Sequence, residues 1–149
     1  MSDNYLQLIP TDPQIQPSVQ TAEHARSLLE KFTPDAETVV ASFKESVEFF
    51  NSGSNGSEIR CPACGAEASY WWLSAMDEAW KSRFNQLEVT AHCCKASVCL
   101  NELRYDWPAG FARFVLEARN PNIPDLSYEQ LAQLESVLGC SLRRIWLRR

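Results

Sequence analysis

The chain has 149 residues, 45% of them hydrophobic and 22% charged, which is typical of a folded globular domain with a buried core. Its net charge of −5 argues against a general nucleic-acid-binding surface, because contacts between basic side chains and phosphates supply most non-specific affinity. No apolar run approaches the roughly 20 residues that span a bilayer, and the N-terminal residues lack a basic segment followed by an apolar one, so we expect a cytoplasmic protein without a membrane partner.

The first third of the chain predicts a strand, a helix and one segment with two possible structures. Residues 5–10 predict a short strand that ends at a proline. In residues 18–32 apolar side chains recur at helical spacing, and Ser18 or Thr21 can cap the start of this helix. Residues 33–50 fit a helix with a proline in its first turn, or a strand with alternating apolar residues. Their β-branched and aromatic content favours the strand.

The middle of the chain predicts a turn, a helix and a hairpin. Residues 51–57 have the composition of a turn, and we place a subdomain boundary there. Residues 87–93 and 95–105 predict two strands around a tight turn. Residues 71–86 predict a helix whose buried stripe consists of Leu73, Met76, Trp80 and Phe84.

The last third of the chain predicts two helices and a strand. Residues 108–118 begin with a proline and carry apolar side chains at helical spacing, which predicts a helix. Residues 127–138 predict a second helix, with Ser127 as its N-terminal cap and Gly139 as its C-terminal stop. Residues 140–149 predict a closing strand.

The order of these elements favours an α+β fold. The outer parts of the chain can form an antiparallel sheet backed by helices, as in split β-α-β folds. We therefore predict a single domain over residues 1–149. Within it, residues 58–105 form an inserted, zinc-ribbon-like lobe that holds five of the six cysteines.

The cysteines give the clearest chemical signal in the sequence. Without an export signal we expect no disulfide framework, since cytosolic thiols are kept reduced. Clustered cysteines in such a chain bind metal or carry out redox chemistry. The six are Cys61, Cys64, Cys93, Cys94, Cys99 and Cys140.

The run Cys-Pro-Ala-Cys-Gly at residues 61–65 is typical of a metal knuckle. Such a turn supplies two thiolates, and a glycine directly after the second cysteine permits the positive φ that the turn needs. The run resembles the first knuckle of zinc-ribbon proteins. The second candidate, Ala-His-Cys-Cys-Lys at residues 91–95, departs from the usual form. Ala91 stands where the first cysteine is expected, and Lys95 stands where a glycine is often found.

We predict one structural Zn²⁺ held by four thiolates, since structural zinc sites take four tetrahedral ligands. An all-thiolate set argues for a closed site and against a catalytic metal. The irregular second knuckle leaves open whether the site is full or degraded. His92 is the first reserve ligand and Cys99 the second. The predicted ligands are Cys61, Cys64, Cys93 and Cys94.

A redox pair is the main alternative for Cys61 and Cys64. A thioredoxin-type Cys-Pro-x-Cys needs its first cysteine at a helix N-terminus, where the helix dipole and free amides lower the thiol pKa. Here a glycine follows at once, and the next helical pattern begins only near residues 70–73. That spacing favours the knuckle over the redox pair, and inert packing is the third possibility.

Three stretches carry a resemblance to a known family. They are the cysteine-bearing run of residues 61–94, the run of residues 100–121 and the run Leu-Gly-Cys-Ser-Leu-Arg-Arg-Ile at residues 138–145. With them the chain resembles, over most of its length, a family of uncharacterised bacterial proteins with a zinc-ribbon-like CPxCG…CC cluster. Some members carry transporter-like names. The resemblance implies no established activity.

Arginines and tryptophans mark the other candidate surfaces. Residues 143–149 hold four arginines and one tryptophan, which predicts an edge strand protected by charge, or contact with an acidic partner or nucleic acid. The neighbours Trp71 and Trp72 cannot both face one core from a helix. We expect them to pack at the junction of the lobe and the sheet, or one of them to be exposed at a partner site.

The sequence contains no recognisable catalytic set. It has only two histidines, no glycine-rich phosphate loop and no nucleophile motif. We therefore predict a non-enzymatic, zinc-binding protein-interaction module, such as an adaptor or an immunity-like protein, whose partner is another protein. The first alternative is a zinc-ribbon nucleic-acid-binding protein. The second is a thiol–disulfide redox protein that uses Cys61 and Cys64.

Overall fold

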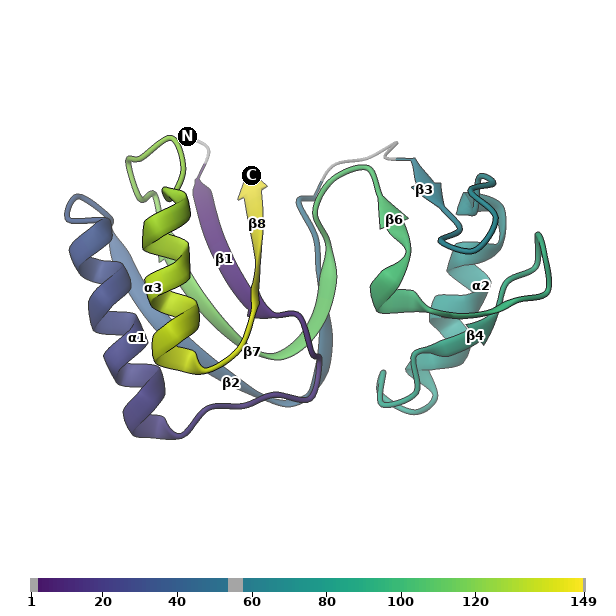
Figure 1. Ribbon diagram of the computed structural model, residues 1–149, viewed down its shortest axis with the longest axis horizontal. Helices are drawn as coiled ribbons and strands as arrows, with labels where there is room; N and C mark the ends of the chain where they lie inside the picture. The colour runs from purple at the N-terminus through teal and green to yellow at the C-terminus, as the bar shows by residue number, and fades with distance from the viewer. Residues whose placement is uncertain (1–2, 54–57, 149) are drawn as a thin grey trace.

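The computed structural model describes residues 3–53 and 58–148, which form a sheet lobe and a smaller cysteine lobe (Figure 1). The elements of the sheet lobe are β1 (Asn4–Pro10), α1 (Val19–Phe32), β2 (Thr38–Phe50), β7 (Gly110–Arg119), α3 (Tyr128–Leu138) and β8 (Leu142–Arg148). The four strands lie in the order β2-β7-β1-β8, and α1 and α3 pack side by side on one face of the sheet. No helix in the described part of the chain is both long enough and apolar enough to cross a bilayer.

The sheet lobe has the topology of a split β-α-β fold, as predicted. Helix α1 joins β1 to β2, but these strands do not pair, because β7 lies between them and is antiparallel to both. β8 pairs with the other side of β1. The predicted α+β fold with an antiparallel sheet backed by helices is confirmed. The boundaries of the single domain, 1–149, and of the inserted lobe, 58–105, stay predictions.

Local signals explain where the two helices of the sheet lobe begin and end. The Ser18 side chain caps α1 by accepting from the Thr21 N–H at 3.1 Å. Ser127 and Gln130 form a reciprocal capping box at the start of α3. Gly139 ends α3 with a φ of +74°, a left-handed conformation that glycine adopts without steric cost.

The core of the sheet lobe lies between the sheet and its two helices. Alternate residues of the strands point toward the helices, because successive side chains of a strand face opposite sides. Full burial of each large apolar side chain contributes about 1.5–3 kcal/mol. The large side chains of this core that are completely buried are Leu6, Leu8, Leu29, Phe114, Leu116 and Leu134.

Strand β7 corrects the sequence analysis, because residues 108–118 do not form the predicted helix. Phe114 and Leu116 lie under the helices in the core, and Val115 between them points to the other face. β7 pairs with a strand on each side, and it carries buried residues on both faces. Such a central strand contains so many apolar residues that a helical spacing can also be drawn through them.

Strand β2 confirms the structure that its β-branched and aromatic residues favoured. Its register with β7 shifts in the middle: Phe43 lies opposite Phe114, whereas Glu48 lies opposite Ala112. β2 therefore carries extra residues here, and an irregularity of this kind increases bend and twist. The antiparallel pair of β2 and β7 curves strongly in Figure 1 and ends beside the cysteine lobe.

The cysteine lobe comprises the described residues between β2 and β7. Its elements are β3 (Ile59–Arg60), α2 (Ser69–Trp80), β4 (Glu88–Thr90), β5 (Ser97–Cys99), the 3₁₀ turn η1 (Leu100–Glu102) and β6 (Arg104–Tyr105). β3 pairs with β6, and β4 pairs with β5. The predicted hairpin in this part of the chain is thus confirmed, with shorter strands than the sequence indicated.

Helix α2 shows that the predicted buried stripe is wrong in part. Leu73 and Trp80 are 67% and 48% exposed, whereas Trp71 and Ala79 are buried in the core of the lobe. The buried face thus follows a spacing of four residues that includes small side chains, which let the helix approach the strands closely. Phe84 is buried as predicted, but it lies beyond the helix, which ends at Trp80.

Phe111 of β7 joins the two lobes by entering the core of the cysteine lobe. Its ring centre lies 4.9 Å from that of Phe49 and 5.2 Å from that of Phe84. Trp72 packs on Phe49 with 5.7 Å between the ring centres, and its Nε1–H donates to the hydroxyl oxygen of Tyr105 at 3.2 Å. Trp72 therefore packs at the junction of the lobes.

A buried amide, Asn101, adds polar contacts to this junction. Its Oδ1 accepts from the Phe111 N–H at 2.9 Å and from Arg143 Nη1 at 3.2 Å, and its Nδ2 donates to the Thr11 carbonyl at 2.8 Å. Gly110 leaves room for this arginine, because a Cβ at that position would lie 2.7 Å from Nη1. The absence of a side chain here is thus a condition for the contact between the lobes.

Candidate metal centre

The first knuckle is the loop between β3 and α2. The backbone N–H of Cys61 donates to the Ala66 carbonyl at 2.9 Å, and the N–H of Gly65 donates to the Cys61 carbonyl at 2.9 Å. Gly65 has a φ of +75°, which is the left-handed conformation that the sequence predicted for this glycine. These two hydrogen bonds close the loop into a tight turn.

The second knuckle, the loop between β4 and β5, repeats the same hydrogen bonds. The Ala91 N–H donates to the Ala96 carbonyl at 2.8 Å, and the Lys95 N–H donates to the Ala91 carbonyl at 2.7 Å. Lys95 has a φ of +64°, close to that of Gly65. Ala91 therefore occupies the place of Cys61, and Lys95 that of Gly65, as the sequence comparison of the two runs proposed.

The two knuckles bring four sulfurs together at one end of the cysteine lobe. The Sγ atoms of Cys64 and Cys93 lie 3.4 Å apart, and those of Cys61 and Cys94 lie 3.9 Å apart. All four sulfurs lie within 4.8 Å of one another. Tetrahedral zinc with Zn–S bonds of about 2.3 Å holds its sulfurs about 3.8 Å apart. The donor set and its spacing thus fit a tetrahedral thiolate site.

Cys93 supplies the sulfur that Ala91 lacks. When the two knuckles are matched by their hydrogen bonds, Cys94 corresponds to Cys64 and Cys93 corresponds to Ala63. The fourth sulfur therefore comes from inside the turn and not from its first residue. This displacement accounts for the irregular spacing in the sequence while the four sulfurs still converge.

The clustered thiols perturb each other's ionisation. Burial raises the pKa of Cys61, but hydrogen bonds from the backbone N–H groups of Cys64 and Ala63 and from neighbouring thiols outweigh it and lower this pKa to about 7. Burial, together with hydrogen bonds to the thiols of Cys64 and Cys61, raises the pKa of Cys93 to about 12. One thiolate forms easily here, whereas the accumulation of several negative charges needs a cation to compensate them.

Arg60 supports the first knuckle from the preceding strand. Its Nη1 donates to the Gly65 carbonyl at 3.0 Å, and its Nη2 donates to a carboxylate oxygen of Glu58 at 2.7 Å. The Ala68 N–H also donates to the Ile59 carbonyl at 2.7 Å, so the ends of the loop are held together. The sequence analysis did not single out this arginine, because a lone basic residue beside a cysteine carries no specific signal.

The reserve ligands lie outside the group of converging sulfurs found among the described residues. His92 is exposed, and its ring meets that of Tyr70 edge-on with 5.7 Å between centres. Cys99 lies at the end of β5 opposite Glu88, and burial raises the pKa of its thiol. Cys140 packs against the core of the sheet lobe.

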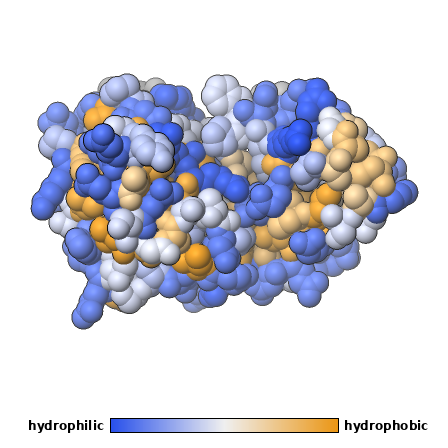
Figure 2. Space-filling view, in the orientation of Figure 1, coloured by the Kyte–Doolittle hydropathy of each residue, from blue (hydrophilic) through white to orange (hydrophobic). Residues whose placement is uncertain are grey.

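The position of Cys61 does not match a thioredoxin-type redox site. α2 begins at Ser69, after the knuckle has closed, so the helix N-terminus does not start at this cysteine. The Cys61 side chain is also completely buried. Cys64 and Cys94 of the same cluster are exposed, and Figure 2 shows apolar side chains on the surface at the far end of the cysteine lobe.

No protein-family model, no curated protein and no solved structure matches this chain. The resemblance to a bacterial family, which residues 61–94, 100–121 and 138–145 carry, therefore stays a prediction.

Proposed function

We propose that this chain is a non-enzymatic protein-interaction module, such as an adaptor or an immunity-like protein, whose cysteine lobe is held by one structural Zn²⁺. The observation that carries this proposal is the convergence of four sulfurs within 4.8 Å. Four thiolates fill a tetrahedral coordination shell and leave no open position for water or substrate. The proposed ligands are Cys61, Cys64, Cys93 and Cys94.

The architecture of the cysteine lobe supports a structural role for the metal. Its strands are only two or three residues long, so hydrogen-bonded ladders contribute little to its stability. A metal at the knuckles would cross-link the β3–α2 loop to the β4–β5 loop. In small domains of this kind the free energy of metal binding acts as free energy of folding. Such a site requires reduced thiols, which favours the cytoplasm as its location.

The outer face of α2 supports an interaction role. Tyr70, Leu73 and Trp80 are 64%, 67% and 48% exposed, and their spacing places them on one side of the helix. The Arg83 guanidinium lies 4.6 Å from the centre of a Trp80 ring. Tryptophan, tyrosine and arginine dominate the binding energy of protein interfaces. The proposed metal would keep this face rigid, so less conformational entropy is lost on binding.

Metal content and thiol reactivity of the purified full chain test the structural metal. We expect one zinc per chain, with at most two reactive thiols, Cys99 and Cys140, before chelation. All six thiols should react after chelation in denaturant. Cys64→Ser should abolish stoichiometric metal. The matched variant Cys99→Ser should retain it, because this thiol lies outside the cluster.

One outcome of this experiment would contradict the structural metal. Protein from zinc-supplemented cells that carries no metal and exposes all its thiols without chelation would contradict a structural metal site. A site that is merely degraded would give this outcome.

A nucleic-acid-binding protein is the first alternative, motivated by the arginine-rich end. Arg143 is committed to Asn101, and Arg144 donates to the Leu126 carbonyl at 3.0 Å. Arg149 lies outside the described residues. Retention on immobilised DNA or RNA that weakens steeply with salt would favour this alternative. Absence of binding at low salt would exclude it.

A thiol–disulfide redox protein is the second alternative. The lowered pKa of Cys61, about 7, favours it, because the thiolate is the reactive form. The complete burial of this side chain opposes it. A reversible disulfide between Cys61 and Cys64 in protein purified with its native metal content would support the alternative. Stoichiometric metal that protects both thiols from alkylation would count against it.

A further inference from the structure

We propose that the outer edge of β8 binds an extended, acidic segment of another protein, which adds to the four-stranded sheet as a further strand and packs between Trp107 and Trp146. This inference deepens the proposed interaction role, and it rests on that role in taking a protein as the partner. β8 belongs to the sheet lobe, and the other lining residues come from the segments that directly follow β2 and directly precede β7. The candidate metal centre lies in the two knuckles of the cysteine lobe (Figure 1).

β8 is an edge strand, since among the described residues it pairs only with β1. In an antiparallel pair, residues alternate between those bonded to the partner strand and those whose backbone groups point away. The Thr11 N–H donates to the Ser141 carbonyl at 3.0 Å, which fixes the phase of this alternation. Consistently, the Leu142 N–H turns away from β1 and donates to the Glu135 carboxylate at 2.8 Å.

The same alternation places the backbone groups of three further residues on the free edge. These residues are Arg144, Trp146 and Arg148. A row of outward N–H and C=O groups is a template for an added strand. Their side chains share one face of the sheet, so each neighbouring position of an added strand would meet an arginine or the tryptophan.

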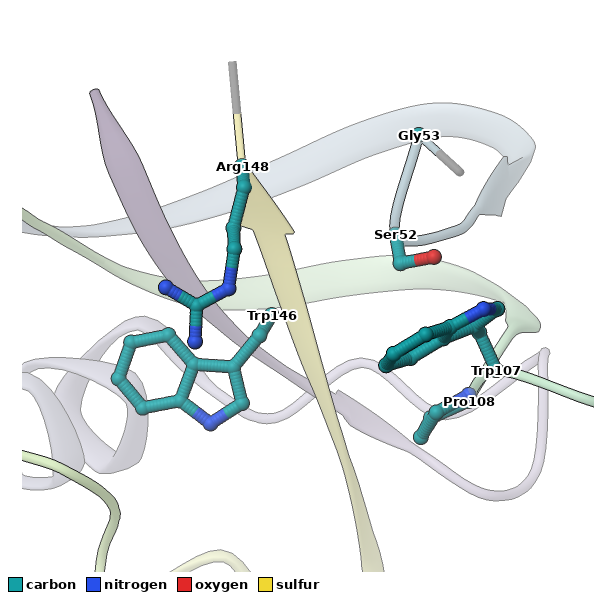
Figure 3. Close-up of a pocket in the computed structure, with 6 residues that line it drawn as sticks. All are labelled: Ser52, Gly53, Trp107, Pro108, Trp146 and Arg148. Atoms are coloured by element: carbon teal, nitrogen blue, oxygen red, sulfur yellow. The ribbon is translucent and has the colours of Figure 1, made fainter. Parts of the chain in front are cut away.

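A pocket of about 460 Å³ opens beside this edge (Figure 3). β8 passes between the indoles of Trp107 and Trp146 in this view. Trp107 is 54% exposed, which is unusual for so large an apolar surface without a partner. The lining residues in the described part of the chain are Ser52, Gly53, Trp107, Pro108, Trp146 and Arg148.

The Trp146 side of the pocket is already held in place by its neighbours. The Trp146 Nε1–H donates to Asp125 Oδ1 at 3.3 Å, and the other carboxylate oxygen of Asp125 lies 3.3 Å from Arg144 Nη1. The indole is thus oriented before any partner arrives. Preorganisation of this kind reduces the entropy that binding must overcome.

The charge of the edge favours an acidic segment. The Arg148 guanidinium lies 5.5 Å from the centre of a Trp146 ring, and among the described residues it forms no ion pair. Arg144 stands four residues before Arg148 on the same face, and its neighbour Asp125 compensates only one of these two charges. The edge is therefore locally positive on a chain of net charge −5. Carboxylates of an added strand can meet Arg148 without displacing an existing partner.

The same charges disfavour a second copy of this chain as the occupant. Two β8 strands paired about a two-fold axis near Trp146 would place Arg144 of each copy opposite Arg148 of the other. Like charges directly opposite each other destabilise a strand pair. A heterologous acidic strand avoids this repulsion.

Fluorescence anisotropy with a labelled peptide, Glu-Val-Glu-Val-Glu-Val-Glu, tests the proposal on the full chain. We expect saturable binding that weakens as salt rises. The same peptide with lysine for glutamate should bind at least about tenfold more weakly, because the edge arginines repel it. A version with proline in place of the valines should not bind, because proline lacks the N–H that an added strand donates.

Variants of the chain locate the binding surface. Trp107→Ala and Arg148→Glu should each weaken binding of the glutamate peptide by about tenfold or more, as expected for anchor residues. Val19→Ala is the control, because it shortens an apolar side chain that is 74% exposed at the start of α1, away from this edge, and it should leave the affinity unchanged. Metal content is measured on every sample.

Several results would overturn the proposal. One is equal binding of the proline or lysine peptide, and another is unchanged affinity in both Trp107→Ala and Arg148→Glu. A dimer in sedimentation that Arg148→Glu abolishes would assign the edge to a second copy, and displacement of the peptide by single-stranded DNA would assign it to nucleic acid. If metal-loaded protein fails to bind the peptide, the edge site alone is overturned. If protein from zinc-supplemented cells binds the peptide but carries no metal, the structural metal alone is overturned.

Discussion

The sheet lobe and the cysteine lobe differ in the interactions that stabilise them. Strands of the sheet lobe are 7 to 13 residues long, whereas those of the cysteine lobe have two or three residues. Long ladders and two packed helices make the first lobe an ordinary α+β core. The second lobe has one helix and two minimal strand pairs, and units this small commonly need a metal or a disulfide. The difference explains why the clustered sulfurs lie in the second lobe.

The two lobes are nevertheless coupled, because the antiparallel pair of β2 and β7 contacts both of them. Phe114 of β7 belongs to the core of the sheet lobe, and Phe111 of the same strand belongs to the core of the cysteine lobe. The strand thus passes from one core into the other within three residues. We therefore expect loss of the proposed metal to loosen the cysteine lobe first and to weaken the sheet lobe only through this pair of strands.

The largest difference between the lobes is expected on loss of a metal ligand. Cys61→Ser should unfold the cysteine lobe while the sheet lobe keeps its structure, because structural zinc contributes on the order of 10 kcal/mol of apparent binding free energy in small domains. Far-ultraviolet and near-ultraviolet circular dichroism with and without added zinc would show it. Cys140→Ser is the control in the sheet lobe. Equal loss of structure in both variants would contradict the separation of the two cores.

A second comparison uses one buried phenylalanine from each core. Phe114→Ala and Phe84→Ala should each cost about 3–5 kcal/mol, because each removes a buried ring and leaves a cavity. Phe114→Ala should lower the stability of the sheet lobe, and Phe84→Ala that of the cysteine lobe. Denaturant unfolding followed by hydrogen exchange distinguishes the lobes. If both variants destabilised the same set of amides, the two cores would be one cooperative unit.

A substitution at the junction of the lobes should lower the free energy of unfolding by a smaller amount. Asn101→Ala should cost about 1–3 kcal/mol, because it leaves the Phe111 N–H without its buried acceptor and the Thr11 carbonyl without the Asn101 donor. Metal content should not change, since Asn101 touches neither knuckle. Gln133→Ala, at an exposed amide of α3, is the control and should change stability little. An unchanged unfolding midpoint for Asn101→Ala would remove this residue from the account of the junction.

The smallest change in metal affinity is expected when one sulfur is moved to another position of the second knuckle. Cys93→Ala alone should lose the metal, whereas the double variant Ala91→Cys with Cys93→Ala should regain it. The hydrogen bonds of Ala91 match those of Cys61, so a cysteine there would complete a regular Cys-x-x-Cys knuckle. Competition with a chromogenic chelator measures the affinity. Failure of the double variant to bind metal would show that the two knuckles are not equivalent.

Much of the fold could be predicted from local patterns. Caps at Ser18 and Ser127 and the stop at Gly139 mark helix ends because they satisfy backbone groups within a few residues. β7 could not be predicted in this way, since its position between β1 and β2 is set by long-range pairing. The exposed face of α2 was missed for a related reason. Which side of a helix is buried depends on the neighbouring strands as well as on its own apolar stripe.

The candidate site was predictable to a similar extent. The run of residues 61–65 carries its geometry in its own residues, through a glycine with positive φ. The place of Cys93 inside the second knuckle depends on the hydrogen bonds that close that loop. The spacing of the cysteines in the sequence does not reveal these hydrogen bonds. Asn101 and Arg143 escaped notice because their partners come from distant parts of the chain. Trp107 and Trp146 likewise approach one pocket only in the folded chain.

Hydrogen exchange of the full chain before and after chelation tests the central claim most directly. With metal bound, amides of β4 and β5 should be protected almost as well as those of β1 and β7. After chelation, protection in β4, β5 and the two knuckles should disappear, while β1 and β7 keep most of theirs. Unchanged exchange in the cysteine lobe after complete removal of the metal would show that its four sulfurs do not hold the lobe together.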